Sequence, residues 1–142
     1  MNDVKSLNFE SGLVTYNING KCQVSFNPTD SNFVERLYLA FEDLDKKQES
    51  YKTQVEKLAD KREIFDFARE RDVEMRQVID GLFDAPVSDS LFGGMSVYAV
   101  AGGLPVWCNL MLAGMDEIDT TFSREQKATN PRIAKYTEKY HR

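Results

Sequence analysis

The sequence contains no glycine or proline between residues 31 and 80. A segment of this length without helix breakers is typical of long α-helices. Apolar residues recur along it at spacings of three, four and seven, which predicts a single narrow hydrophobic stripe: Val34, Leu37, Phe41, Leu44, Tyr51, Val55, Leu58 and Phe65. Because a narrow stripe buries little area alone, such a helix must pair with another helix or bridge solvent. We expect two long charged helices over 31–83, broken near Asp60 or Lys61, with one broken helix as the alternative.

A β-hairpin is predicted over residues 13–26, ahead of these helices. Asn19-Gly20 accepts the positive φ values of a two-residue type I′ turn, and apolar and polar residues alternate on both sides of it. The apolar positions share one face, which must pack against a helix or another chain: Val14, Tyr16, Ile18, Cys22, Val24 and Phe26. We expect Ser31 to cap the helix that follows.

Glycine and proline reappear after residue 80 and divide the rest of the chain. Pro86 ends the second helix, Ser88–Ser90 can cap a short turn, and Gly93-Gly94 ends that turn. Pro105 is suited to the first turn of an amphipathic helix over 105–127. These elements predict an α+β fold, mainly α, in a single domain of residues 1–126.

Composition and charge restrict the class of protein. A chain of 142 residues with 42% hydrophobic residues can bury a core without disulfides, and no apolar segment resembles a signal peptide or membrane span. Residues 1–126 carry 13 Lys and Arg against 22 Asp and Glu, whereas residues 127–142 carry 5 against 1. The acidic body argues against general nucleic-acid binding. We expect a cytosolic protein with a basic, flexible tail over 127–142.

Residues that could carry catalysis or hold a metal are sparse. His141, the single histidine, is next to the last residue, where a general base is hard to hold in place. Cys22 and Cys108 have no zinc-ligand spacing and are expected in the core. Asp116 and Asp119 share a helical face but offer too few oxygens for a cation. We therefore expect no enzymatic activity, no metal and no cofactor.

Charged residues in two regions have alternative interpretations. Arg62, Arg69, Arg71 and Arg76 alternate with acidic residues, which predicts an exposed, salt-bridged helix rather than a basic patch. The tail mixes aromatic residues with basic ones, so it can contact nucleic acid or an acidic protein surface, or serve only as a solubilising terminus. Its basic residues are Arg132, Lys135, Lys139 and Arg142.

An apolar cluster rich in methionine lies between residues 91 and 115. Met95 and Tyr98 belong to it, and methionine-rich surfaces can re-pack around varied apolar helices. Our hypothesis is that its main members contribute to self-association or to binding a client protein: Leu91, Phe92, Trp107, Met111 and Met115. The alternative is that these residues form the domain's own core.

Six short motifs follow one another between residues 16 and 126: Ile18-Asn19-Gly20, Asp30, Val34-Glu35-Arg36, Val78-Ile79-Asp80, Leu82-Phe83 and Leu91-Phe92-Gly93. Their order, ahead of a final amphipathic helix, resembles that of tail assembly chaperones of long-tailed bacteriophages and prophages. The end of the chain, 129–142, is not part of that pattern. The resemblance implies a non-enzymatic homo-oligomer in the host cytoplasm that binds the tape-measure protein and assists assembly of the tail tube. It brings no catalytic residues.

Two other functions stay open. One is a virion structural part, such as a head–tail connector or minor tail protein, in which the basic tail contacts DNA or an acidic neighbour. The other is a small phage protein that binds and modulates a host protein. Against the second, the acidic residues are interleaved with basic ones rather than arrayed as in a nucleic-acid mimic.

Overall fold

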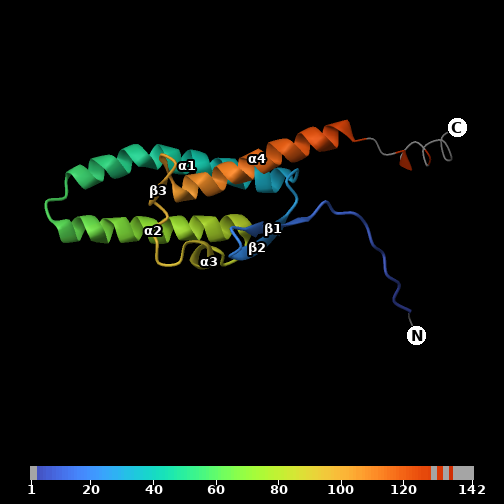
Figure 1. Cartoon of the computed structure of the whole chain (residues 1–142), viewed down its shortest axis with the longest axis horizontal. Helices are drawn as coiled ribbons and strands as arrows, with labels where there is room; N and C mark the ends of the chain where they lie inside the picture. The colour runs from blue at the N-terminus through green and yellow to red at the C-terminus, as the bar shows by residue number, and fades with distance from the viewer. Residues whose placement is uncertain (1–2, 129–130, 133–134, 136–142) are drawn as a thin grey trace.

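The computed structural model describes residues 3–128, 131, 132 and 135. It is an α+β structure, mainly α, as expected (Figure 1). The elements are β1 (Val14–Ile18), β2 (Cys22–Phe26), α1 (Ser31–Glu56), α2 (Lys61–Phe83), α3 (Ser88–Phe92), β3 (Val100–Ala101), β4 (Leu104–Pro105) and α4 (Val106–Lys127). The two short ladders, β1–β2 and β3–β4, are both antiparallel.

The long charged segment is a helical hairpin, so the prediction of two helices is confirmed. α1 and α2 run side by side and are joined by residues 57–60 (Figure 1). Asp60 caps α2 by accepting a hydrogen bond from the backbone N–H of Arg62 (3.0 Å). Asp30 caps α1 in the same way through Asn32 (3.0 Å), so the expectation that Ser31 is the cap was wrong. Ser31 is already the first helical residue.

The hydrophobic stripe changes face where the helix breaks. Leu37, Leu44 and Tyr51 are buried on α1, but Phe65 of α2 is 60% exposed. The buried residues of α2 lie later, at Met75, Ile79 and Leu82. The four-residue connection 57–60 resets the helical phase, so a stripe counted straight through it predicts the wrong face of α2.

The β-hairpin has the predicted strands but a different turn. Asn19 and Gly20 both have positive φ, as expected, yet Ile18 pairs with Cys22, which leaves Lys21 as a third loop residue. A two-residue loop would pair Tyr16 with Gln23 and place apolar and polar residues on one face. The observed register pairs Tyr16 with Val24, so burial of one apolar face determined the register.

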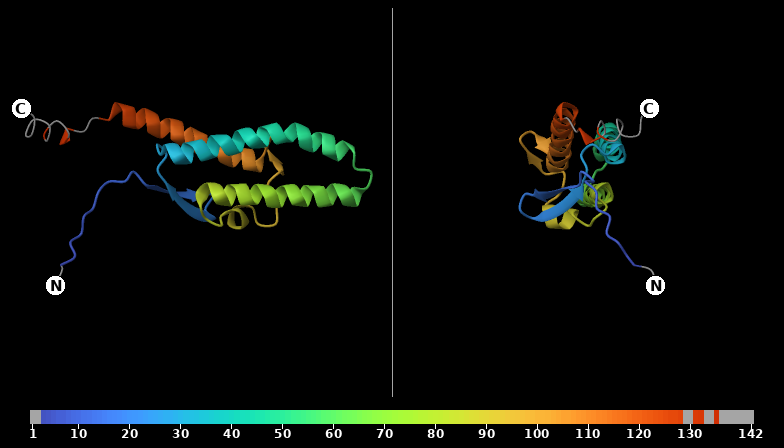
Figure 2. Two further views of the ribbon diagram at one scale, coloured as in Figure 1. Left: turned by 180° about the vertical axis from the view of Figure 1, so that it is seen from behind. Right: turned by 90° about the vertical axis from the view of Figure 1, so that its right-hand side faces the viewer.

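The core lies where the hairpin, α1, α2 and α4 meet. The end view in Figure 2 places α4 beside α1, and the hairpin and α3 beside α2. Phe26 stacks on Phe33 of α1 with 4.1 Å between ring centroids, and Phe83 of α2 lies 6.1 Å from Phe26. Gly114 allows close packing of α4, since a Cβ there would lie 3.3 Å from Cδ2 of Leu37.

Candidate functional site

An open groove lies between the tip of the β-hairpin, the segment after α3 and the first half of α4. Its volume is about 340 Å³. The groove is lined mainly by apolar side chains, with Lys21 as its single charged residue: Ile18, Asn19, Lys21, Leu91, Phe92, Met95, Ala101, Val106, Asn109, Leu110 and Ala113. We call this the apolar groove. Met95 is 48% exposed at its edge, and Phe92 is half-buried.

The apolar groove continues along β1 into a smaller hollow of about 230 Å³. The two share Ile18, Asn19, Leu110 and Ala113. At the far end of this hollow, the hydroxyl of Tyr16 donates a hydrogen bond to Oε1 of Glu117 (2.9 Å). Burial and this carboxylate raise the pKa of Tyr16 to about 12, so the phenol stays protonated and keeps the bond at neutral pH.

One arginine of α2 holds the wall of the groove that carries Phe92 and Met95. The Arg76 Nη2 atom donates to the carbonyl oxygens of Gly93 (2.7 Å) and Met95 (2.8 Å). Its Nε atom donates to Asp72 (3.0 Å), whose other oxygen accepts from the backbone N–H of Val97 (2.8 Å). The side chain of Arg76 is only 14% exposed. Charge-assisted bonds of this kind fix the path of the loop.

The opposite end of the same wall is held by Asp80. Its Oδ1 atom accepts from the backbone N–H groups of Val87 (2.9 Å) and Ser88 (2.8 Å), and Oδ2 accepts from the Ser88 hydroxyl (3.1 Å). These bonds satisfy the donors at the start of α3. Lys21 of the hairpin loop reaches the carbonyl of Leu91 at the other end of α3 (3.4 Å). The wall is therefore held from α2 and from the hairpin.

The structure separates the five residues of the predicted binding face. Leu91, Trp107 and Met111 are buried, with Met111 only 1% exposed, so they belong to the domain's own core. Phe92 is half-buried and lines the apolar groove. Met115 is also half-buried, but it packs against the core and does not line the groove. Only Leu91 and Phe92 of the five line the groove.

Several groove residues were predicted as members of apolar faces and not as parts of a binding site. Ile18 belongs to the hairpin face, and Val106 and Leu110 belong to the apolar face of the last helix. They come together because the hairpin tip, the segment after α3 and the start of α4 meet there. The signal present in the sequence was that both the hairpin and the last helix carry an apolar face.

The arginines of α2 are not all solvated, which corrects the interpretation of that face. Arg62 and Arg69 are exposed, and Arg69 pairs with Asp66. Arg76 belongs to the groove wall, and Arg71 is sandwiched between two tyrosine rings. Its guanidinium carbon lies 4.2 Å from the ring centroid of Tyr51 and 4.1 Å from that of Tyr98. This cation–π contact fastens the loop before β3 to the helical hairpin.

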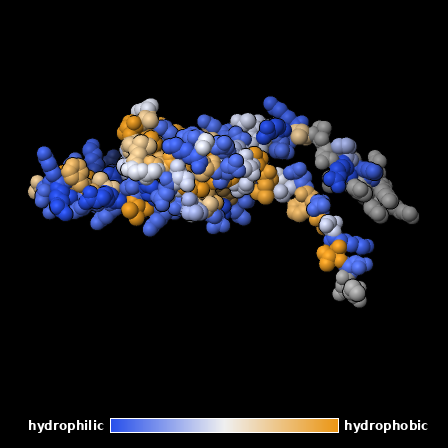
Figure 3. All heavy atoms as spheres, turned by 60° about the horizontal axis from the view of Figure 1, so that its bottom comes forward, coloured by the Kyte–Doolittle hydropathy of each residue, from blue (hydrophilic) through white to orange (hydrophobic). Residues whose placement is uncertain are grey.

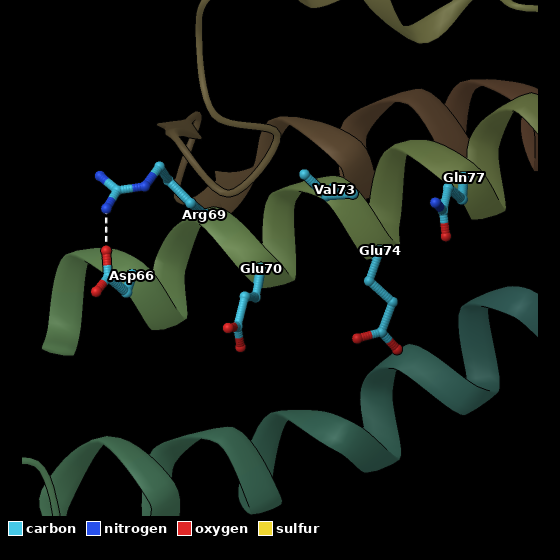
Figure 4. A pocket seen from close by; sticks show the side chains of 6 residues that line it. All are labelled: Asp66, Arg69, Glu70, Val73, Glu74 and Gln77. Carbon is cyan, nitrogen blue, oxygen red and sulfur yellow. Dashed lines mark hydrogen bonds and ion pairs between the residues drawn. The ribbon is translucent and has the colours of Figure 1, made fainter.

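A second surface hollow, of about 480 Å³, lies along α2 (Figure 4). Glu70 and Glu74 point from it toward α1, and Asp66 pairs with Arg69 at one end (Figure 4). Lys47 of α1 lies 2.9 Å from Glu74. The carboxylates raise the pKa of that lysine, so the ion pair is intact at neutral pH. Through Glu74, this charged surface takes part in pairing α1 with α2.

Neither cysteine shows the environment of a reactive thiol. Cys108 is buried and Cys22 half-buried, and burial raises the pKa of both thiols. Across residues 3–128, 131, 132 and 135, no three His, Cys, Asp or Glu side chains come together as metal ligands would. No helix in that part of the chain is long and apolar enough to cross a membrane.

The basic tail falls largely outside the residues that the structure describes. Arg132 and Lys135 are exposed, and the backbone N–H of Lys135 donates to the carbonyl of Pro131 (3.0 Å). Lys139 and Arg142 lie outside the described residues. The predicted role and flexibility of the tail stay predictions.

Comparisons of the chain with protein-family models, with curated proteins and with solved structures find no significant match. The function is therefore argued from the groove and from the motif order in the sequence.

Proposed function

We propose that this protein is a non-enzymatic assembly chaperone of a phage tail, which binds an apolar segment of the tape-measure protein in the apolar groove. The order of the short motifs along residues 16–126 suggests that the assembly concerned is that of a phage tail. The single observation that carries binding is the groove itself. Apolar side chains from three separate parts of the fold converge there and stay accessible, with Met95 48% exposed.

The groove suits one apolar face of a polypeptide rather than a small molecule. It is open to solvent, and its lining includes the polar residues Asn19, Lys21 and Asn109. A client helix could place residues spaced three or four apart into it, with Phe92 and Met95 adapting to different side chains. A long client with repeated apolar faces would take up many copies, each bound weakly, and gain through effective concentration.

The distribution of surface chemistry supports the same role. Figure 3 shows hydrophobic residues interspersed with hydrophilic ones over the wide part of the molecule, whereas the far end of the α1–α2 pair is mostly hydrophilic. In a complex, the charged α1–α2 hairpin would face solvent and keep the coated client soluble.

Co-expression with the tape-measure protein tests this proposal. We expect the client to remain soluble and to co-purify with the wild-type chain. Met95→Asp and Leu110→Asp place a carboxylate in the groove and should reduce co-purification at least about tenfold, because burying an unpaired charge costs more than about 1.4 kcal/mol. Leu39→Asp, on the exposed face of α1, is the matched control and should leave capture unchanged.

Circular dichroism would establish that each variant is folded. Folded groove variants that capture the tape-measure protein as well as the wild type would contradict the proposal. The protein composition of finished particles distinguishes a chaperone from a structural component of the virion. A chaperone is absent from purified particles, and its presence there would favour a connector or minor tail protein instead.

A further inference from the structure

The segment before β1 leaves the body of the protein as an exposed arm (Figure 1). We call residues 3–11 the arm, and every one of them is exposed. Among the residues that the structure describes, its apolar side chains are the most exposed of the large hydrophobic ones: Val4 is 97% exposed, Leu7 91% and Phe9 82%. Figure 3 shows hydrophobic atoms along the arm, which extends away from the body. Side chains of this size are normally buried in a protein or an interface.

The base of the arm is held in a defined direction. The Asn27 side chain donates to the carbonyl of Ser11 (3.0 Å) and accepts from the backbone N–H of Thr29 (2.8 Å). Gly12 has a φ of +72°, and a Cβ there would lie 2.5 Å from Nδ2 of Asn27. This turn, which favours glycine, carries the arm away from its own β1 instead of back along it.

An extended apolar segment needs partners for its backbone hydrogen bonds and an apolar surface for its side chains, and the apolar groove with its adjoining hollow offers both. In the part of the chain that the structure describes, β1 pairs only with β2, so its other edge has backbone N–H and C=O groups without a ladder partner. Four consecutive residues of this strand and its turn, Tyr16–Asn19, line the hollow that faces Leu110 and Ala113 of α4. An added strand could bond to β1 and place alternate side chains onto α4.

We propose that the arm of a second copy of this chain occupies the apolar groove, and that two copies exchange arms reciprocally. The lengths agree, because six arm residues from Val4 to Phe9 span about 20 Å as a strand and the five residues of β1 span about 17 Å. The charges agree as well. The arm carries Asp3, Lys5 and Glu10, with a net charge of −1, and Lys21 is the single charged residue that lines the apolar groove, whereas Glu117 in the adjoining hollow accepts the hydrogen bond of Tyr16.

Reciprocal exchange also gives an interface of adequate size. Nine arm residues and the eleven residues that line the groove place about twenty interface residues on each copy, which is the lower end for a standard stable interface. A single arm in a single groove would provide half of that. Two arms related by a twofold axis make a closed, isologous dimer.

Sedimentation velocity of the full chain tests this inference. At about 100 μM, where a contact of standard size is saturated, we expect the wild type to sediment as a dimer. Phe9→Asp on the arm and Met95→Asp in the groove should each give a monomer with unchanged circular dichroism. Phe65→Asp, on an exposed position of α2, is the control and should leave the dimer intact.

Mixing the two monomeric variants tests the pairing directly. One intact arm and one intact groove remain, so a mixture of Phe9→Asp and Met95→Asp should form a heterodimer, weaker than the wild type. A chain with both changes should stay monomeric in every mixture. A monomeric wild type would overturn the inference, and so would a Phe9→Asp variant that dimerises like the wild type.

The experiments distinguish a failure of arm exchange from a failure of the proposed function. Phe9→Asp leaves the groove intact, so it should still capture the client, whereas Met95→Asp should lose both activities. A monomeric wild type that captures the tape-measure protein would overturn arm exchange alone. A dimer that captures no client would overturn the chaperone proposal alone.

Discussion

The hydroxyl of Tyr16 donates to Oε1 of Glu117 across 2.9 Å, although the two residues are 101 positions apart in the sequence. This bond joins β1 to α4 in the smaller hollow that continues the apolar groove, and it holds the hairpin against α4 there. Tyr16 also stacks on Phe26, with 4.6 Å between ring centroids. The position of the hairpin on α4 thus depends on both the ring and the hydroxyl of Tyr16.

Removing the hydroxyl should loosen the hairpin without unfolding the protein. We expect Tyr16→Phe to lower the free energy of unfolding by about 1–2 kcal/mol, because a half-buried bond to a carboxylate is lost while the ring stack remains. Urea unfolding would measure the change. Tyr38→Phe, at an exposed position of α1, is the matched control and should change stability by less than about 0.5 kcal/mol.

The same tyrosine predicts a loss of stability in alkali. The folded-state pKa of Tyr16 is raised to about 12 from an ordinary value of 10.0, so its contribution is complete below pH 10 and is lost as the pH rises toward 12. Burial raises the pKa values of Tyr51 and Tyr98 in the same direction. Wild-type stability should therefore fall between pH 10 and 12. Tyr16→Phe should fall less steeply, and equal slopes would contradict this assignment.

Of the partly exposed residues that hold the groove wall, Arg76 should cost the most stability when it is replaced. Arg76→Ala leaves Asp72 half-buried without its cation and frees the carbonyls of Gly93 and Met95, so we expect a loss of about 2–4 kcal/mol. Amide hydrogen exchange should rise over 93–97. Arg69→Ala removes an exposed pair and should cost less than about 0.5 kcal/mol. Unchanged exchange over 93–97 in Arg76→Ala would contradict this role.

Lys21, the third residue of the hairpin loop, should matter because it lengthens the loop, and its side chain should matter little. Deleting Lys21 leaves a two-residue loop, which would pair apolar with polar positions across the strands. We expect the deletion to cost at least about 3 kcal/mol, since several apolar side chains leave the core. Lys21→Ala should cost less than about 1 kcal/mol. Equal stability of the two variants in urea unfolding would show that the register is not set in this way.

Features that depend on local chemistry were predictable from the sequence. The absence of glycine and proline from 31 to 80, together with Asp60 at the break, predicted two long helices but not that they fold back on each other, and Asn19-Gly20 predicted the position of the turn. The loop length was missed because turn propensity and face burial favour different registers, and burial of the apolar face, which covers five of its six side chains at least in part, outweighs one turn.

The groove could not be predicted in the same way. Its walls come from segments distant in sequence, and whether Trp107 or Leu110 is buried depends on which side of α4 meets α1. Arg71 and Arg76 look like members of a solvated charged helix until the loop over 93–98 is placed against them. Residue type alone does not distinguish an arginine that anchors a loop from one that faces water.

Photo-crosslinking from the edge of the groove tests most directly that this surface receives another polypeptide. Replacing Met95 with a benzophenone-bearing amino acid puts the probe at an exposed lining position, and Leu39 on α1 is the control position. For the chain alone, we predict crosslinks from position 95 to residues 3–11 of a second copy. With the tape-measure protein present, we predict crosslinks to that client, and none from position 39. Crosslinks from position 95 that reach only residues of the same chain, in both conditions, would contradict the account.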